Sequence, residues 1–309
     1  MLLYGLRSDP DFSGVTARLL VSCPSAGEEE GGLFLLDFAG NRMTKLYAGG
    51  CTGFVRAGGR WIVAAEGDEL IAFDDRFRIA ARKKWRKSDF HGAAALDDGV
   101  VLFAETGRNA VGCYDADSLE RIGEIRFSPE ERDVFHINDI WVEGRMLYVS
   151  AFTSSGKWFL DPLAKSGTIS AIDLADFRPD ARLDADLAAR PVAGGLRMPH
   201  SVIVHNGRIA YCDSMMFRVS AGGADIQFPG FTRGLAIGED AVFVGQSRMR
   251  HVLRIPHQFS NCAQDAGVHV YLPEWRISRF VPLPVQQVYQ IALRPEDWPA
   301  GRCFHEPDR

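Results

Sequence analysis

A short unit of polar and apolar positions recurs along the chain. A polar residue or glycine precedes a short apolar run, and a turn then leads into a second apolar run that ends in small or polar residues. Residues that favour β-structure flank turns rich in Gly, Asp, Asn and Glu, so each unit predicts a β-hairpin. The copies lie at 53–66, 93–105, 139–150, 201–213 and 234–245.

The first two copies are each followed by two further strand-like runs, at 69–74 and 78–82 and at 110–115 and 121–126. Four antiparallel strands in one unit are typical of a propeller blade. The spacing between copies mostly suits blades of roughly 40 to 50 residues. One spacing is longer and predicts an insertion, which we place at 153–165 and 178–198.

The two ends of the chain complete each other. A sixth unit begins at 289–293 but lacks its remaining strands, and the N-terminal runs at 18–22, 32–37 and 43–47 can supply them. A ring closed in this way has no exposed sheet edge. We therefore predict an all-β fold, a six-bladed β-propeller forming a single domain over 1–309, with a lid-like insertion around 153–165. The alternative, a β-sandwich with irregular hairpins, explains neither the repeat nor the incomplete units.

Composition narrows the class of partner. The net charge of −5 and a pI near 5.9 argue against nucleic-acid binding, which usually requires a basic face. No stretch approaches the roughly 18 apolar residues of a membrane helix, and 1–14 lacks the pattern of a secretion signal. The six cysteines form no disulfide framework. We expect a cytoplasmic protein whose partner is a small molecule, and the oligomeric state stays open.

Polar residues precede the inner strand of each predicted blade. The first strand of a blade lines the propeller axis, so these residues should converge at one end of the central channel. Three of the eight histidines fall at equivalent places in consecutive blades. The converging set consists of Cys51, Thr52, His91, His136, Asn138, Asp139, His200, Ser201, Thr232, Arg233, Tyr289 and Gln290.

The chemistry of this set suggests a division of roles. Histidine exchanges protons near neutral pH, so His136 and His200 are the candidate acid/base pair, with Tyr289 as a further acid or hydrogen-bond donor. The planar fork of Arg233 suits a carboxylate, sulfate or phosphate. The remaining candidates for substrate binding are Asn138, His91, Thr52 and Gln290. Each histidine taken alone could equally cap a strand by bonding a backbone carbonyl.

A divalent metal is an open alternative. His91, His136 and His200 could form a three-histidine site with one free coordination position. The chain contains no local ligand motif such as His-Glu-x-x-His, so no cofactor is assigned.

Several motifs resemble an uncharacterised bacterial family of propeller-like proteins. The matching steps are Met198-Pro-His-Ser201, His205-Asn-Gly-Arg208, Pro229-Gly-Phe-Thr-Arg-Gly-Leu-Ala236, Val244-Gly-Gln-Ser247 and His136-Ile-Asn138. The family has Tyr-Asp near the end, where this chain has Tyr289-Gln290. The resemblance spans roughly 130 to 295 and implies a propeller with no assigned activity. More distantly, the architecture resembles six-bladed lactonases and lyases, which work at the channel mouth and commonly bind a divalent ion through Glu, Asn and Asp.

The leading functional hypothesis is an enzyme that acts at the channel mouth on a small polar or anionic metabolite or a sugar derivative. Histidine acid/base chemistry would make it a lyase, hydrolase or isomerase. The alternatives are a non-catalytic propeller that binds a sugar, peptide or protein, and a polar ring with only a structural role. A pocket closed by 153–165 would favour the enzyme, and a broad aromatic face would favour partner binding.

Overall fold

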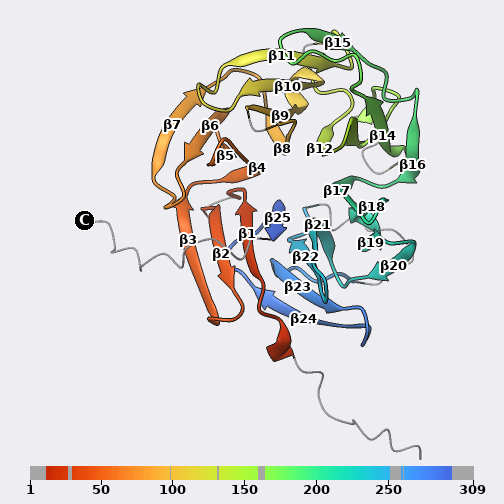
Figure 1. The fold of residues 1–309 in the computed structure, drawn as a ribbon. Helices are drawn as coiled ribbons and strands as arrows, with labels where there is room; N and C mark the ends of the chain where they lie inside the picture. Colours follow the sequence, from red (N-terminus) through yellow and green to blue (C-terminus); the bar gives the residue numbers. More distant parts are fainter. Residues whose placement is uncertain are drawn as a thin grey trace, which may run out of the picture.

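The fold is a ring of six small sheets around a central axis (Figure 1). The computed structural model describes residues 12–26, 30–97, 99–130, 132–158, 164–250, 259 and 261–293. The predicted six-bladed β-propeller is confirmed. The strands of each blade follow from the innermost outward.

The first blade closes the ring, and the third blade has a fifth strand. The first blade consists of β25 (Gln290–Leu293), β1 (Arg18–Cys23), β2 (Gly32–Asp37) and β3 (Arg42–Ala48). The second consists of β4 (Cys51–Ala57), β5 (Arg60–Ala65), β6 (Glu69–Phe73) and β7 (Ile79–Lys84). The third consists of β8 (Phe90–Ala95), β9 (Val100–Glu105), β10 (Ala110–Asp115), β11 (Arg121–Arg126) and β15 (Arg182–Asp184).

The last three blades have four strands each. The fourth consists of β12 (Ile137–Glu143), β13 (Met146–Ala151), β14 (Gly167–Asp173) and β16 (Pro191–Leu196). The fifth consists of β17 (Pro199–His205), β18 (Arg208–Asp213), β19 (Arg218–Ala221) and β20 (Ala224–Gln227). The sixth consists of β21 (Phe231–Ile237), β22 (Val242–Ser247), β23 (Gly267–Leu272) and β24 (Ile277–Pro282). Short 3-10 turns are η1 (Phe12–Gly14), η2 (Thr106–Arg108) and η4 (Ser214–Met216).

The ring closes through the first blade, as predicted. Strand β25 pairs antiparallel with β1, with Leu20 opposite Ala292, and Figure 1 shows the two side by side near the axis. The side chain of Gln290 extends the closure to the second blade. Its Nε2 donates to the carbonyl oxygen of Phe54 and its Oε1 accepts from the Phe54 amide, both at 2.9 Å.

The long spacing between the fourth and fifth blades is only partly an insertion. Residues 178–198 supply β16, the outer strand of the fourth blade, and β15, which pairs in parallel with β11 of the third blade. In the other predicted segment, 153–165, residues 159–163 lie outside the described residues.

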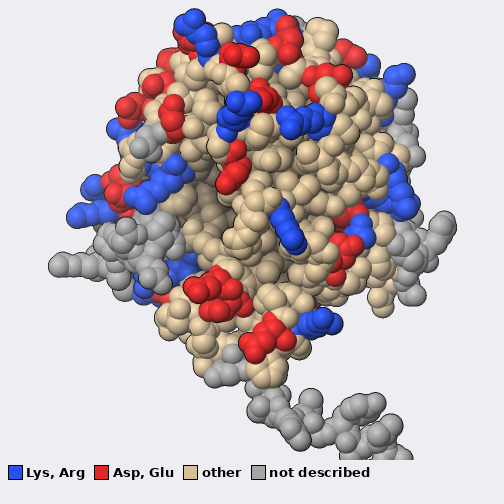
Figure 2. All heavy atoms as spheres, turned by 45° about the vertical axis from the view of Figure 1, so that its right-hand side comes forward, with Lys and Arg blue, Asp and Glu red and all other residues tan. Residues whose placement is uncertain are grey.

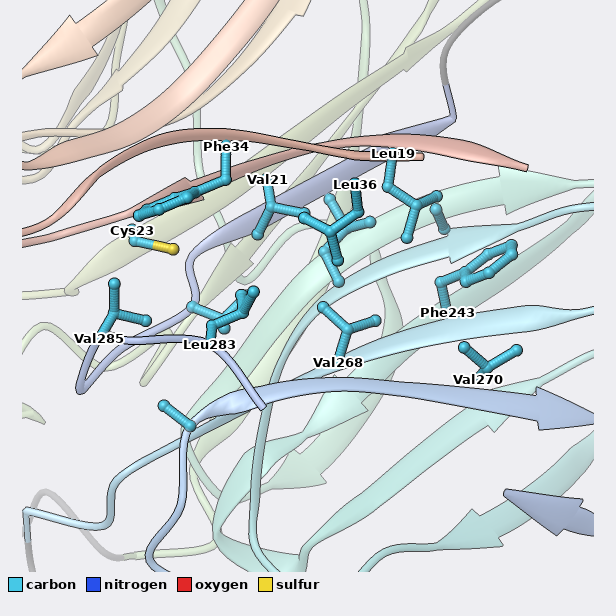
Figure 3. Packing of buried hydrophobic residues seen from close by; sticks show 14 of the residues in the cluster. Leu19, Val21, Cys23, Phe34, Leu36, Phe243, Val268, Val270, Leu283 and Val285 are labelled. Atoms are coloured by element: carbon cyan, nitrogen blue, oxygen red, sulfur yellow. The ribbon is translucent and has the colours of Figure 1, made fainter. Parts of the chain in front are cut away.

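Packing between blades forms the core. Leu19, Val21 and Cys23 of β1 face Val268 and Val270 of β23 across the junction of the first and sixth blades (Figure 3). Blades cover both faces of such a strand, so β1 is apolar and buried along nearly its whole length. Each large side chain buried in this way contributes about 1.5–3 kcal/mol.

Glycines allow the inner strands to approach one another near the axis. A Cβ atom on Gly53 of β4 would overlap the carbonyl oxygen of His91 in β8, and one on Gly92 of β8 would overlap the carboxylate of Asp139 in β12. The backbone of β8 packs directly against Gly53, and the side chain of Asp139 packs directly against Gly92, so neither position has room for a side chain. This close approach brings the beginnings of the inner strands together.

The surface carries charges of both signs. Figure 2 shows acidic and basic side chains interspersed over the visible face. Within the described part of the chain, no helix has the length and apolar character needed to cross a membrane.

Candidate functional site

A cavity of 280 Å³ lies where four inner strands begin. His91 is the second residue of β8, His136 directly precedes β12, His200 is the second residue of β17 and Arg233 is the third of β21. The repeat therefore brings four of the predicted residues into one cavity. The described residues that line it are Asp89, His91, His136, Phe152, Trp158, Met198, His200, Phe231, Arg233, Ser247, Arg248, Met249, Arg250 and Gln287.

Aromatic and imidazole rings alternate along one wall. The ring of His136 contacts those of Trp158 and Phe152, with centroid separations of 4.4 and 4.2 Å. The ring of His200 contacts those of Phe152 and Phe231, at 5.4 and 5.6 Å. The rings meet in tilted or edge-to-face arrangements, and the wall between the imidazole groups is aromatic and apolar.

The tautomers of two histidines follow from their partners. Nδ1 of His91 lies 2.9 Å from the carbonyl oxygen of Asp89, and Nδ1 of His200 lies 2.8 Å from that of Met198. A carbonyl oxygen can only accept, so Nδ1 carries the hydrogen in both rings. Burial lowers the pKa of both histidines well below 6.5, with the nearby Arg233 adding to the effect. Both rings are therefore neutral at pH 7, and each Nε2 has a free lone pair.

His136 is held by a carboxylate. Its Nδ1 lies 2.6 Å from Oδ2 of Asp133, and its backbone amide donates to Oδ1 of the same side chain at 2.7 Å. Two bonds to one carboxylate fix the orientation of the imidazole, which leaves Nε2 as the nitrogen for chemistry. Asp133 lies three residues before His136 and was not among the predicted residues.

The backbone around the histidines is strained. Asp89, His136 and Met198 have φ angles of 47°, 50° and 52°, in the left-handed region that side chains other than glycine rarely adopt. Asp89 and Met198 lie two positions before His91 and His200, and His136 is itself a cavity histidine. Such strain persists only where the surroundings enforce it, and it concentrates at functional sites.

Arg233 supplies a buried positive charge. The side chain is 5% exposed, and its guanidinium carbon lies 4.0 Å from the centre of the Tyr289 ring. One Nη donates to Oε1 of Gln287 at 3.3 Å, and Nε has no hydrogen-bond partner among the described residues. Among the described residues, no carboxylate forms an ion pair with Arg233. A buried cation without an anion is costly, so this group is suited to an anionic ligand.

Two further arginines reach the cavity. Arg248 and Arg250 directly follow β22 and are exposed. Asp89 is the one carboxylate among the described lining residues. The balance of charge therefore favours an anion inside the cavity.

Asn138 and Tyr289 lie outside the cavity lining. The Tyr289 hydroxyl donates to the Asn138 carbonyl oxygen at 2.8 Å and lies 3.2 Å from its Oδ1. Burial raises the pKa of Tyr289 well above 10. This position does not fit the expected transfer of a proton to substrate. The ring of Tyr289 instead supports Arg233, and Asn138 anchors Tyr289.

Thr52 and Gln290 also lie outside the lining and join neighbouring inner strands. Thr52 Oγ1 donates to the carbonyl oxygen of Phe90 at 2.8 Å, which links β4 to β8. Gln290 links β25 to β4 through Phe54. Their hydrogen-bonding groups are used between blades, so the substrate contacts expected of them do not fit these positions.

The three histidines are not arranged as metal ligands. Among the residues that the structure describes, no group of three or more His, Cys, Asp or Glu side chains could hold a metal ion. The ring of Phe152 contacts the rings of both His136 and His200. The three-histidine metal site expected from the sequence does not fit this arrangement.

Several cavity residues were not predicted, and four of them share a position in the repeat. Hairpin strands are antiparallel, so the residues after the second strand return to the end of the channel where the first strand begins. Phe152 follows β13 in this way, and Arg248, Met249 and Arg250 follow β22. Their place after the second strand of a hairpin is therefore the sequence signal that points to them. Asp89, Met198, Phe231 and Gln287 lie near the starts of inner strands.

Comparison with known proteins identifies the fold alone. No family model and no curated protein matches the sequence. A solved protein of unknown function from Bacteroides caccae has a TM-score of 0.60 at 12% identity, over 91% of this chain and 100% of that chain. Regucalcin from Agrobacterium tumefaciens strain C58, described as a calcium-binding protein, has 0.55 at 12%, over 80% and 79%. A chain of the nidogen/laminin complex has 0.57 at 10%, over 90% and 98%.

Proposed function

We propose that the protein is an enzyme that binds a small anionic metabolite in the channel-mouth cavity and moves a proton on it. Arg233 binds the anionic group, and His136 and His200 act as the acid/base pair. The single observation that carries the proposal is the buried guanidinium of Arg233, which has no carboxylate partner among the described residues and lies in the same cavity as three histidines. The reaction class is a lyase, isomerase or hydrolase.

The chemistry needs no group beyond these side chains. Nε2 of a neutral histidine accepts a proton from a carbon next to the carboxylate-bearing group, and that ring becomes an imidazolium. The electron pair of the broken C–H bond stays on the ligand as an enolate, whose charge the Arg233 guanidinium stabilises. The second histidine, once protonated, returns a proton to the ligand or to a leaving group. Asp133 fixes the direction of the His136 ring throughout.

The size and burial of the cavity favour an enzyme over a non-catalytic module. Ligand pockets for small molecules begin at about 300 Å³, so 280 Å³ suits a small metabolite rather than a peptide or a protein surface. Two of its histidines have pKa values lowered by burial, a property that concentrates at active sites. The side chain of Trp158, from the predicted 153–165 insertion, forms part of the wall.

Hydrogen–deuterium exchange tests the proposal. The protein is incubated in D₂O with pyruvate, 2-oxobutyrate and phenylpyruvate, and loss of the C3 proton signals is followed by NMR. We expect faster exchange with at least one acid, and a loss of at least about tenfold in both Arg233→Met and His200→Gln.

The matched control is His205→Gln, at the far end of the same strand β17, where the imidazole contacts Asn206 on the surface. It should exchange at the wild-type rate. Exchange no faster than in His200→Gln for all three acids, or equal exchange in wild type, His136→Gln and His200→Gln, would overturn the proposal.

A further inference from the structure

The size of the cavity limits its ligand to roughly one ring with substituents. An apolar cavity of about 150 Å³ holds benzene, so 280 Å³ is about twice that space. A single six-membered ring with a carboxylate and one further small group fits this volume, whereas a disaccharide or a nucleotide does not.

One wall of the cavity is apolar and rich in aromatic side chains. Phe152, Met198 and Met249 belong to one buried hydrophobic cluster, and Trp158 and Phe231 pack against it. All five side chains also line the cavity. Aromatic rings prefer tilted or edge-to-face neighbours, and methionine sulfur contacts ring edges favourably. An extended aliphatic chain uses such a wall less well than a planar ring does.

The free nitrogens on this wall require hydrogen-bond donors from the ligand. Nδ1 of His91 and Nδ1 of His200 donate to backbone carbonyl oxygens, so each Nε2 can only accept. No described residue forms a hydrogen bond to either Nε2. A polar atom left without a partner on ligand binding costs free energy, so the ligand should present a hydroxyl group here.

Together these features identify a ligand class. We infer that the cavity binds a small aromatic carboxylate that carries a hydroxyl group, with the carboxylate at Arg233 and the ring against Phe152 and Phe231. This inference rests on the proposed function and adds the chemical class of the substrate. The carboxylate of the substrate lies on a side chain of the ring, which also carries the C–H bond to be broken, as in phenylpyruvate, and ring-bound carboxylates serve as binding probes. The hydroxyl group donates to an imidazole Nε2.

Calorimetric titration with 4-hydroxybenzoate, benzoate, cyclohexanecarboxylate and 4-hydroxybenzamide tests each feature. We expect 4-hydroxybenzoate to bind most tightly. The loss of the hydroxyl, of aromaticity or of the charge should each weaken binding by about tenfold or more.

Variants locate the effect in the cavity. Phe231→Leu retains an apolar side chain but removes the ring, and it should reduce the preference for 4-hydroxybenzoate over cyclohexanecarboxylate by about fivefold or more. The matched control is Phe228→Leu, a buried phenylalanine in the same stretch of chain that does not line the cavity. Circular dichroism and thermal melting confirm that both variants are folded, and the control should keep the wild-type preference.

The outcomes separate this inference from the proposed function. If cyclohexanecarboxylate or benzoate binds as tightly as 4-hydroxybenzoate, while binding still depends on Arg233 and exchange of the 2-oxo acids persists, the ligand class is wrong and the proposed function stands. If none of the carboxylates binds and no 2-oxo acid exchanges, both are wrong. An unchanged preference in Phe231→Leu would also overturn the ligand class.

Discussion

The guanidinium carbon of Arg233 lies 4.0 Å from the centre of the Tyr289 ring, and the two residues come from neighbouring blades. The aromatic face holds the cation in place without neutralising it. A carboxylate partner would have satisfied Arg233 and removed its affinity for ligands. Stacking on Tyr289 therefore holds the Arg233 guanidinium in place and leaves its positive charge free to bind an anionic ligand.

Tyr289→Phe should separate support of the fold from support of Arg233. Losing the hydroxyl leaves the buried carbonyl oxygen of Asn138 without this donor, which should lower the free energy of unfolding by about 1–3 kcal/mol in urea titrations. The ring remains, so benzoate affinity should stay within about twofold. Tyr289→Leu removes the ring and should weaken benzoate binding further. Equal affinities in the two variants would contradict the stacking role.

His200→Gln should change how stability depends on pH. The folded-state pKa of His200 lies below its ordinary value of 6.5, so below pH 6.5 the unfolded chain binds more protons and stability falls as the solution is acidified. The slope for one such group approaches 1.36 kcal/mol per pH unit. Urea titrations between pH 7.5 and 5 should show a shallower loss in His200→Gln. His205→Gln should retain the wild-type slope, and an equal slope in all three proteins would disprove this assignment.

Asp139 should affect the pH dependence of stability in the opposite direction from His200, and Asp139→Asn tests this. Burial raises the pKa of Asp139 to about 7, so the folded state retains a proton that the unfolded chain loses above 3.8. This contribution to stability is therefore complete below pH 3.8 and is lost as pH rises towards 7. Removing the ionisable group should raise the free energy of unfolding at pH 8 by on the order of 1 kcal/mol, with a smaller gain at pH 5. A gain in the free energy of unfolding that is the same at pH 5 and pH 8 would contradict the raised pKa of Asp139.

Gln290→Leu should weaken ring closure without altering the cavity. The substitution removes two hydrogen bonds to Phe54 and leaves a partly buried amide and carbonyl unpaired, at a cost of about 2–4 kcal/mol. Urea unfolding measures this loss. Affinity for benzoate should remain within about twofold, since Gln290 does not line the cavity. A large loss of affinity in folded protein would restore the substrate contact expected from the sequence.

Asp133→Asn should affect turnover more than binding. Asparagine can present an amide group to Nδ1 of His136 in place of the carboxylate, which favours the wrong tautomer or orientation. The exchange rate of the 2-oxo acids should fall at least about tenfold, with benzoate affinity within about twofold. Glu130→Gln, which changes an exposed carboxylate paired with Arg132, is the control and should leave both quantities unchanged. Equal losses of rate and affinity would assign Asp133 to ligand binding.

The fold could be predicted because one apolar pattern recurs in each blade. The hairpins at 53–66 and 201–213 correspond to β4–β5 and β17–β18, and the incomplete unit at 289–293 was matched to the N-terminal strands. Sheet extension was not predictable in the same way. Strand β15 has only three residues, Arg182–Asp184, and pairs with a blade that it does not follow in the chain. Neither its length nor its neighbours in sequence reveal that partner.

The candidate site was predictable only to the level of which strand ends converge. His91, His200 and Arg233 line the cavity, whereas Asn138 and Tyr289 lie beyond it although they occupy similar places in the repeat. Successive strand residues point in different directions, and a shift of one position decides whether a side chain faces the opening or the channel interior. Inner strands such as β12 also contain register shifts, so the direction of each side chain depends on the local pairing of the strand and not on the sequence spacing alone.

Closure through β25 determines the order in which the propeller can be assembled during synthesis. The ribosome delivers Gln290–Leu293 only after the other five blades have emerged, and β1 waits with an open edge until then. Tyr289 arrives with the same segment. A nascent chain can therefore bring His91, His136 and His200 together early. Arg233 gains its stacking partner Tyr289 only when β25 pairs with β1 and the ring closes.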